Sequence, residues 1–234
     1  MQTLEDLIKQ LNLIKNRGYI KTHRPHDTGI GKTLEDLLNI QENNFRLPDV
    51  GDLELKAKRL DSDSMLTLAT KSPLPRGVNK ILFNNYKYVD EFGEYNLHST
   101  IYGSKPNSIG FRILCQPDKI ILANPLNIEV YWPISIFDDV LKAKSNKILL
   151  VFANTKGERK TATEEFHFVE AYLLSGLNKN KFVNAIVNDR LKVDIRIGVF
   201  RSGKFKGRYH DHGTGLRMIK KDFLSLFDNY AQLI

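Results

Sequence analysis

Two carboxylates and a lysine are concentrated in one short segment of the sequence, residues 48–56. Its second half alternates apolar and charged residues, which predicts a strand over 52–59. Residues two apart in a strand project from the same face, so Glu54 and Lys56 should point together while the leucines beside them face the core. Asp49, just before the strand, could bring a second carboxylate to the same place.

Such a cluster is suited to metal-dependent hydrolysis of a phosphodiester. The carboxylates of Asp49 and Glu54 and the backbone carbonyl of Leu55 would supply the hard oxygen ligands that Mg²⁺ prefers. A lysine beside the metal, Lys56, can hold or help deprotonate an attacking water, and the metal stabilises charge on the phosphate. The alternative interpretation is an exposed strand face with an ordinary ion pair between Glu54 and Lys56.

The rest of the chain must supply the elements that position this cluster. Helices are predicted over 1–17, over the segment containing Leu34, Leu37, Leu38 and Ile40, over 136–144 with Ser135 as N-cap, over 164–189 with a break at 176–178, and at the C-terminus around Phe223, Leu224, Phe227 and Tyr230. Strands are predicted over 52–59, 65–70, 80–84, 99–103, 110–115, 119–123, 127–132, 148–153 and 191–200. Helices at both ends of a strand-rich middle predict a mixed α/β (α+β) fold.

Composition bounds the class of protein. The 234 residues, 41% of them hydrophobic, suffice for one large domain or two intimate lobes with a real core. The longest apolar stretch, 148–153, is too short to span a membrane, and the N-terminus lacks a secretory signal. The single cysteine, Cys115, excludes an internal disulfide and a cysteine metal cluster. We therefore expect a soluble, cytoplasmic protein without a membrane partner.

Positive charge is in excess, and much of it lies near the C-terminus. Thirty-five Lys and Arg against 27 Asp and Glu give a net charge of +8, which favours a polyanionic partner such as nucleic acid. Residues 196–221 hold eight basic side chains with Asp211 as their only acid. Arg can bind guanine through two hydrogen bonds, Asp can accept from cytosine, and His can donate to purine acceptors. The alternatives are a solvated charged loop or, less favoured by the adjacent spacing, a metal site at His210-Asp211-His212.

Several segments of the sequence together resemble a known family. The 48–56 segment resembles the PD-(D/E)xK nuclease signature, and the wider chain resembles the MvaI/BcnI-type restriction endonucleases, which are related to MutH. The matching blocks are Thr28–Leu38, Glu42–Lys58, Leu66–Pro73, Val193–Gly198 with His210–Arg217, and Leu149–Leu174, the last being similar to BcnI-like members. The resemblance implies a restriction-endonuclease-like core, with a central mixed sheet flanked by helices and two lobes around a DNA cleft. A catalytic lobe would span 1–100 and a recognition lobe 101–234, with the two interleaved.

The resemblance also implies roles for individual residues. Asp49, Glu54 and the Leu55 carbonyl would bind one or two Mg²⁺ ions per cleavage site, for which Mn²⁺ could substitute, and Lys56 would be the catalytic lysine. Glu35 would be a supporting acid, with a surface helix carboxylate as the alternative. The residues that would contact DNA are Thr70, Asp194, Arg196, His210, Asp211, His212 and Arg217 at the bases, and Lys204, Lys206 and Arg208 at phosphates.

The family pattern further implies a target of the form CC-N-GG in double-stranded DNA. BcnI-like members carry histidines at the positions of Thr70 and Gly215, whereas this chain keeps small residues there, as MvaI-like members do. This favours CC(A/T)GG over CC(C/G)GG, with relaxed CCNGG left open. The resemblance implies a type II enzyme that acts as a monomer and cuts the strands sequentially, with a methyltransferase expected genetically and not as a stable complex. The alternatives are a MutH-like nicking enzyme of DNA repair and a non-cleaving DNA-binding protein.

Overall fold

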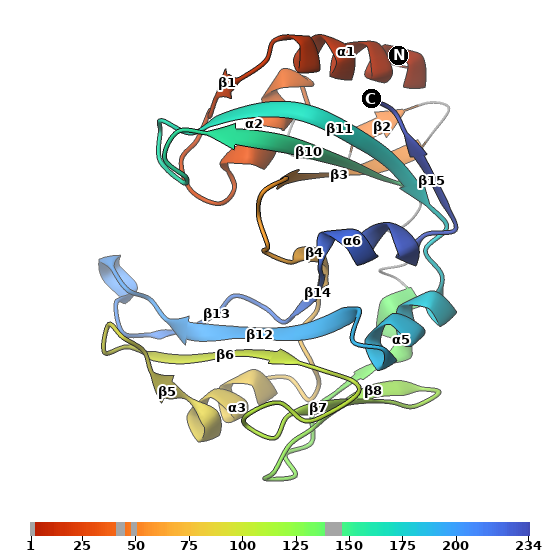
Figure 1. Cartoon of the computed structure of the whole chain (residues 1–234). Coiled ribbons are helices and arrows are strands. Elements are labelled where there is room, and N and C mark those ends of the chain that lie inside the picture. The colour runs from red at the N-terminus through yellow and green to blue at the C-terminus, as the bar shows by residue number, and fades with distance from the viewer. Residues whose placement is uncertain (1–2, 41–44, 48–50, 139–146) are drawn as a thin grey trace. The chain divides into compact units, whose positions relative to one another are not determined.

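The computed structural model describes residues 3–40, 45–47, 51–138 and 147–234, and they form two compact units (Figure 1). Unit 1 comprises residues 1–64, 141–178 and 227–234, and unit 2 comprises residues 65–140 and 179–226. Each unit is thus assembled from segments that are distant in sequence. Residue 100, the predicted boundary between lobes, lies within a strand of unit 2.

Unit 1 contains a mixed sheet. Its order is β1 (Ile20–Lys21), β11 (Glu165–Ser175), β10 (Ile148–Lys156), β3 (Gly51–Arg59) and β2 (Phe45–Leu47), and β15 (Asn229–Gln232) also pairs with β11. The strands β10 and β11 run antiparallel as the long curved pair of Figure 1, whereas β3 runs parallel to β10. The central position of β10 explains its composition, since residues 148–153 are all buried.

Two helices share one core with this sheet. The helix α1 (Leu4–Asn16) begins at a capping box formed by Thr3 and Asp6, and α2 is Gly29–Leu37. The buried members of this core are Leu7, Leu11, Ile14, Ile30, Leu34, Leu38, Leu53, Leu149, Val151, Ala153, Phe166, Phe168 and Ala171, with Leu55 and Ala57 packed against them. The odd-numbered residues of β3 therefore face the core, and its even-numbered residues project from the opposite face.

Unit 2 contains two sheets and several helices. One sheet has the order β4 (Leu66–Thr70), β14 (Gly215–Met218), β12 (Leu191–Val199), β6 (Tyr95–Ile101) and β5 (Tyr88–Val89), with β13 (Tyr209–Asp211) pairing with β12. A smaller sheet has the order β7 (Arg112–Cys115), β8 (Lys119–Ala123) and β9 (Tyr131–Pro133). Its helices include α3 (Val78–Tyr86), α5 (Lys179–Val187) and α6 (Lys220–Phe223), and residues 134–138 are also helical. The 3₁₀ turns are η1 (Gly203–Phe205) and η2 (Leu224–Leu226).

The strand β12 divides the larger sheet of unit 2 into an apolar and a polar face. Leu191, Val193, Ile195 and Ile197 are at most 1% exposed. The side chains of Lys192, Asp194 and Arg196, which alternate with them, project from the other face. The predicted strand over 191–200 and the predicted mixed class are confirmed.

Several predicted elements are wrong. Residues 80–84 lie in α3 rather than in a strand, and residues 165–175 form β11 rather than a helix. The C-terminal helix is limited to α6 and η2, and Tyr230 lies in β15. The strand predicted over 127–132 is confined to β9. Residues 134–138 are helical, so Ser135 lies inside that helix, and the predicted continuation to 144 falls outside the described residues.

No helix among the described residues is long and apolar enough to cross a membrane.

Candidate functional site

Glu54 and Lys56 meet on the outer face of β3. The Lys56 Nζ lies 2.6 Å from Glu54 Oε1, and the two side chains are 16% and 21% exposed, respectively. The alternation of β3 produces this arrangement, because Leu53 is buried in the core and holds its neighbours on the opposite face. The pair is thus a half-buried carboxylate with its cation fixed beside it, still within reach of solvent.

The predicted metal ligands are only partly described. Asp49 lies outside the described residues. The Glu54 N–H donates to the Lys147 carbonyl at 3.1 Å, so the peptide groups of Glu54 serve the ladder with β10 and those of Leu55 face the side of β2. On that side, the described pairing ends at Leu53 opposite Phe45. A carboxylate and a nearby carbonyl are oxygen donors that fit Mg²⁺.

Within the described part of the chain, no three His, Cys, Asp or Glu side chains gather closely enough to hold a metal ion.

Glu35 lies on α2, which packs against β3, and its side chain is partly exposed. Its neighbour Asp36 is bound instead to Lys32 and His23, each at 2.9 Å. The hydrogen bonds from His23 and Lys32 lower the pKa of the Asp36 carboxyl. The structure thus places Glu35 on a helix that packs against the core face of β3, whereas Glu54 and Lys56 project from the opposite face.

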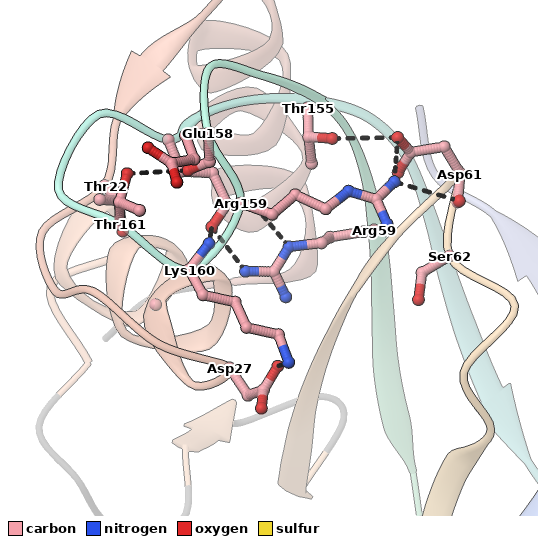
Figure 2. Close-up of polar contacts among 12 residues, drawn as sticks. Thr22, Asp27, Arg59, Asp61, Ser62, Thr155, Glu158, Arg159, Lys160 and Thr161 are labelled. Carbon is pink, nitrogen blue, oxygen red and sulfur yellow. Dashed lines mark hydrogen bonds and ion pairs between the residues drawn. The ribbon is translucent and has the colours of Figure 1, made fainter.

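A buried ion pair closes the C-terminal end of β3. Arg59 Nε and Nη2 donate to the two carboxylate oxygens of Glu164 at 2.6 and 2.7 Å, and Glu164 is 0% exposed. The Lys160 N–H donates to the same carboxylate at 3.0 Å. Figure 2 labels Arg59 and Lys160 of this cluster, and Lys160 Nζ also lies 3.1 Å from Asp27 Oδ1 in the segment before α2. The cluster therefore ties β3 to the segment that leads into α2.

In unit 2, Asp194 and Arg217 form an ion pair on the polar face of the larger sheet. Arg217 Nη1 lies 2.6 Å from Asp194 Oδ2, and the Thr100 hydroxyl donates to Asp194 Oδ1 at 2.9 Å. Arg217 Nη2 also donates to the Met65 carbonyl at 3.2 Å. Because Asp194 is 6% exposed, its carboxylate acts within the protein to fix the guanidinium of Arg217.

Arg196 lies on the same face, two residues after Asp194 on β12. Its Nη2 donates to the carbonyls of His212 and Gly213 at 3.4 and 3.5 Å, and its own carbonyl accepts from the His212 N–H at 3.0 Å. Among the described residues, the buried Nε atoms of Arg196 and Arg217 have no hydrogen-bond partner. Each guanidinium group thus has one buried N–H that is unsatisfied among the described residues.

Three rings lie close together near Arg196, two of them stacked and the third tilted by 40°. The His210 ring stacks on Phe200 with centroids 4.1 Å apart, and the His212 ring lies 4.1 Å from His210. Burial lowers the pKa of the His212 ring, and the nearby His210 and Arg196 lower it further. The neutral form of His212 is therefore favoured, in which one ring nitrogen donates and the other accepts.

The side chain of Asp211 makes hydrogen bonds within unit 2. Its Oδ1 accepts from the Gly213 N–H at 2.7 Å, and its Oδ2 accepts from Asn79 Nδ2 at 2.8 Å. Burial and the Asp211 carboxylate raise the pKa of the nearby Tyr209 hydroxyl. A carboxylate has about four acceptor sites, so Asp211 can still accept from a further donor.

The remaining predicted contacts lie at the edges of this face. Lys204, Lys206 and Arg208 are exposed in the turn between β12 and β13, with Arg208 over the Phe205 ring at 5.4 Å. Thr70 pairs with Gly215 in the β4–β14 ladder. A Cβ at position 215 would lie 3.1 Å from Cγ and Cδ of Arg217, so the glycine leaves room for that side chain.

The sequence-based prediction missed several partners of these residues. Thr100 and His98 lie on β6 opposite Asp194 and Arg196, and Asn79 and Phe200 hold Asp211 and His210. The local signal that could have found the first two is weak, because Leu97 and Ile101 suit a strand but Ser99 interrupts the alternation between them. Asn79 and Phe200 carry no such signal, because their partners are set by tertiary packing.

This chain is similar to known proteins in sequence and in fold. The sequence matches the model of the MvaI/BcnI restriction endonuclease family over residues 8–227. A solved complex of restriction endonuclease MvaI with its cognate DNA substrate is 34% identical, with a TM-score of 0.82 over 99% of this chain and 98% of that one. MvaI in the absence of DNA is 33% identical, with a TM-score of 0.57 over 100% of this chain and 98% of that one. A comparison with curated proteins gives no match. The chain therefore belongs to the MvaI/BcnI restriction endonuclease family, has its fold, and is a type II site-specific nuclease.

Proposed function

We propose that this chain is a Mg²⁺-dependent enzyme that cleaves both strands of DNA at a CC-N-GG type site, with CC(A/T)GG preferred. The observation that carries the proposal is the 2.6 Å contact between Glu54 and Lys56 on the outer face of β3, in a chain of this family. The complex of the similar MvaI with its cognate DNA substrate supports double-stranded DNA as the partner.

In unit 1, Asp49, Glu54 and the Leu55 carbonyl would hold the metal. When bound, Mg²⁺ would supply positive charge against the scissile phosphate and acidify the attacking water. The Lys56 ammonium, fixed by Glu54, would donate a hydrogen bond to the water or phosphate oxygen and hold it in line. For Glu35, on α2, only the family resemblance supports a role as a further carboxylate of this site.

In the recognition unit, the polar face of the larger sheet would read the C:G pairs. Arg196 and Arg217 are suited to guanine O6 and N7, and Asp194 would orient Arg217. His210, His212 and the remaining acceptor site of Asp211 would supply the other base contacts. Lys204, Lys206 and Arg208 would bind phosphates and fix the register.

The central pair would be read near Thr70 and Gly215. These residues are neighbours in the β4–β14 ladder, and both are small. Histidines at these positions accompany a central C:G preference in BcnI-like members, so small residues favour a central A:T pair. We further propose that the protein acts as a monomer and cuts the two strands in sequence, with a methyltransferase protecting host DNA as a separate protein.

A plasmid with one CC(A/T)GG site tests the proposal, beside plasmids with one CC(C/G)GG site or none. We expect purified protein with Mg²⁺ to linearise the first plasmid without any other protein. A nicked product that accumulates without linear DNA would favour the MutH-like alternative. Lys56→Ala should abolish cleavage and keep site-specific binding, whereas the matched control Lys156→Ala, at an exposed lysine of β10, should cleave normally. Cleavage by Lys56→Ala would refute the catalytic assignment.

A further inference from the structure

Asn79 occupies an unusual position for an amide side chain. It lies in the first turn of α3, which begins after Gly77, and it is 5% exposed. Its Nδ2 donates to Asp211 Oδ2 at 2.8 Å and lies 3.4 Å from the hydroxyl oxygen of Thr214, which is 1% exposed. The residue is thus buried and directed at the two ends of the segment 211–214.

That segment connects β13 to β14, and so lies between the predicted base-reading residues His210 and Arg217. Its conformation is set from within by the bond from the Gly213 N–H to Asp211 Oδ1. The Lys71 N–H donates to the Thr214 carbonyl at 2.9 Å, and Arg196 contacts two of its carbonyls. Asn79 provides the contact from α3, on the side chain of Asp211 itself.

The packing of the segment leaves little freedom. Gly213 has φ +80°, and a Cβ there would lie 2.4 Å from Cγ2 of Thr70. The turn therefore rests directly on Thr70, and a small displacement of Asp211 would move His212, Gly213 and the start of β14 together. The amide orientation of Asn79 is also unambiguous, because a flipped amide would place its oxygen against the Asp211 carboxylate.

We propose that Asn79 is a positioning residue for base discrimination, which holds Asp211 and the 211–214 segment in their reading geometry without touching DNA. The proposal rests on the proposed function of this face as the reader of C:G pairs. One Asp211 oxygen is bound to Gly213, and the other accepts from Asn79 at 2.8 Å and from the Tyr209 hydroxyl at 3.5 Å. Asn79 makes the shorter contact to the second oxygen, so the plane of the carboxylate is fixed and its remaining acceptor site has a defined direction. The buried Asn79 Oδ1 has no partner among the described residues, so the side chain is retained there at some cost.

The alternative is that Asn79 only stabilises unit 2. The two roles can be distinguished by the ratio of kcat/KM values on two DNA sequences. A purely stabilising residue changes the amount of folded enzyme and lowers the cleavage of every DNA alike. A positioning residue changes the ratio between the preferred site and a site with one C:G pair replaced, which does not depend on the amount of folded enzyme.

The experiment compares Asn79→Ala, Asn79→Asp and the control Asn85→Ala, which alters an exposed amide on the same helix that bonds only locally to the Ile81 carbonyl. We would measure kcat/KM on the preferred site and on sites with each C:G pair replaced, well below the unfolding temperature of every variant. We expect Asn79→Ala to lose discrimination at one pair by about tenfold, as for a lost hydrogen bond to a charged group. Asn79→Asp, of nearly equal size, should lose more, because two carboxylates would face each other.

Discrimination equal to that of the unmodified protein in both Asn79 variants would overturn the inference, as would an equal loss on all DNA sequences. Failure of both variants to fold would also overturn it, since Asn79 would then be a folding residue. The control Asn85→Ala should match the unmodified protein throughout. If the unmodified protein itself showed no preference for CC-N-GG sites, the proposed function would fail instead, so the two failures are distinct.

Discussion

The ring of Phe200 lies face to face with the ring of His210, with centroids 4.1 Å apart and planes within 7° of parallel. Phe200 directly follows β12 and His210 lies on β13, so the stack spans the turn that carries Lys204, Lys206 and Arg208. His210 in turn contacts His212. The orientation of both histidines is therefore set by a side chain that makes no predicted contact with DNA.

The first prediction concerns this stack. Phe200→Leu should keep an apolar side chain and lose the stacking, which is worth about 0.5–1.5 kcal/mol between aromatic rings. Because His210 would gain rotational freedom, we expect a loss of discrimination at the base pair that it reads, measured as the ratio of kcat/KM values. Phe205→Leu is the matched control, since Phe205 is exposed, its ring centroid lies 5.8 Å from that of Phe200, and its other ring contact is with Arg208, a predicted phosphate contact. Equal behaviour of the two variants would contradict the prediction.

The second prediction separates base contacts from phosphate contacts. Arg217→Ala should lose about 1–3 kcal/mol of discrimination at one base pair, because a bidentate contact to guanine would be removed. Lys206→Ala should weaken binding to all sequences alike and reduce the slope of log affinity against log salt by about 1. Titrations of matched and single-pair-substituted duplexes at several salt concentrations distinguish these outcomes. A sequence-independent loss in Arg217→Ala would show that it binds phosphate.

The elements that the sequence predicts best are those in which local pattern and final burial agree. The strand β3 alternates cleanly, so the shared face of Glu54 and Lys56 follows from spacing alone. Residues 80–84 are predicted as a strand but lie in the helix α3, where Val78, Leu82 and Phe83 are buried and Ile81 is 51% exposed. The short apolar run Ile81–Phe83 suits either element, and only packing decides between them.

The strand β11 failed as a prediction for a different reason. The β10–β11 register shifts between Phe152 and Ala153, which leaves Val169 as an extra residue in β11. The bulge moves the core-facing residues from 166 and 168 to 171 and 173, while Leu174 is buried on the opposite face. The fully buried residues 166, 168, 171 and 174 therefore have a spacing that imitates a helix. A sequence pattern carries no mark of a bulge, because the extra residue is defined by the partner strand.

The residues of the candidate site could be predicted from the sequence, but the contacts between them could not. Residue types and the family resemblance indicate which side chains could read bases, but their mutual contacts join residues far apart. Asp194 meets Thr100 across 94 positions, and Asn79 meets Asp211 across 132. Such contacts depend on strand register and on where α3 docks, and neither can be derived from local spacing.

The third prediction concerns the buried pair at the end of β3. Arg59→Met should destabilise unit 1 by about 3–5 kcal/mol, because it leaves the Glu164 carboxylate buried without its cation. The double variant Arg59→Met with Glu164→Gln should recover part of that loss, since no unpaired charge remains. Urea unfolding followed by circular dichroism measures both. The matched control is Lys156→Met at the exposed pair with Glu165, where we expect a change below about 1 kcal/mol.

The fourth prediction concerns how the stability of unit 1 depends on pH. Burial alone would raise the pKa of the Glu164 carboxyl, but hydrogen bonds from Arg59 and the Lys160 N–H outweigh it, and the pKa is lowered from its ordinary value of 4.5. The unfolded chain therefore binds the proton more readily than the folded one. The stabilisation is fully present above pH 4.5 and is lost as the pH falls through the lowered pKa of the folded state.

In Arg59→Met the principal cause of the lowering is removed and the burial remains, so the pKa of Glu164 should rise above that of the unfolded chain. The sign of its contribution then reverses, because the folded state now binds the proton more readily. We expect the loss of stability relative to the unmodified protein to be largest near neutral pH and to diminish as the pH falls and Glu164 is protonated. Urea unfolding between pH 4 and pH 8 checks this, with Glu164→Gln as the control that lacks the titrating group. A stability difference that stays constant across this range would mean that Arg59 acts through packing against Phe166 rather than through its charge.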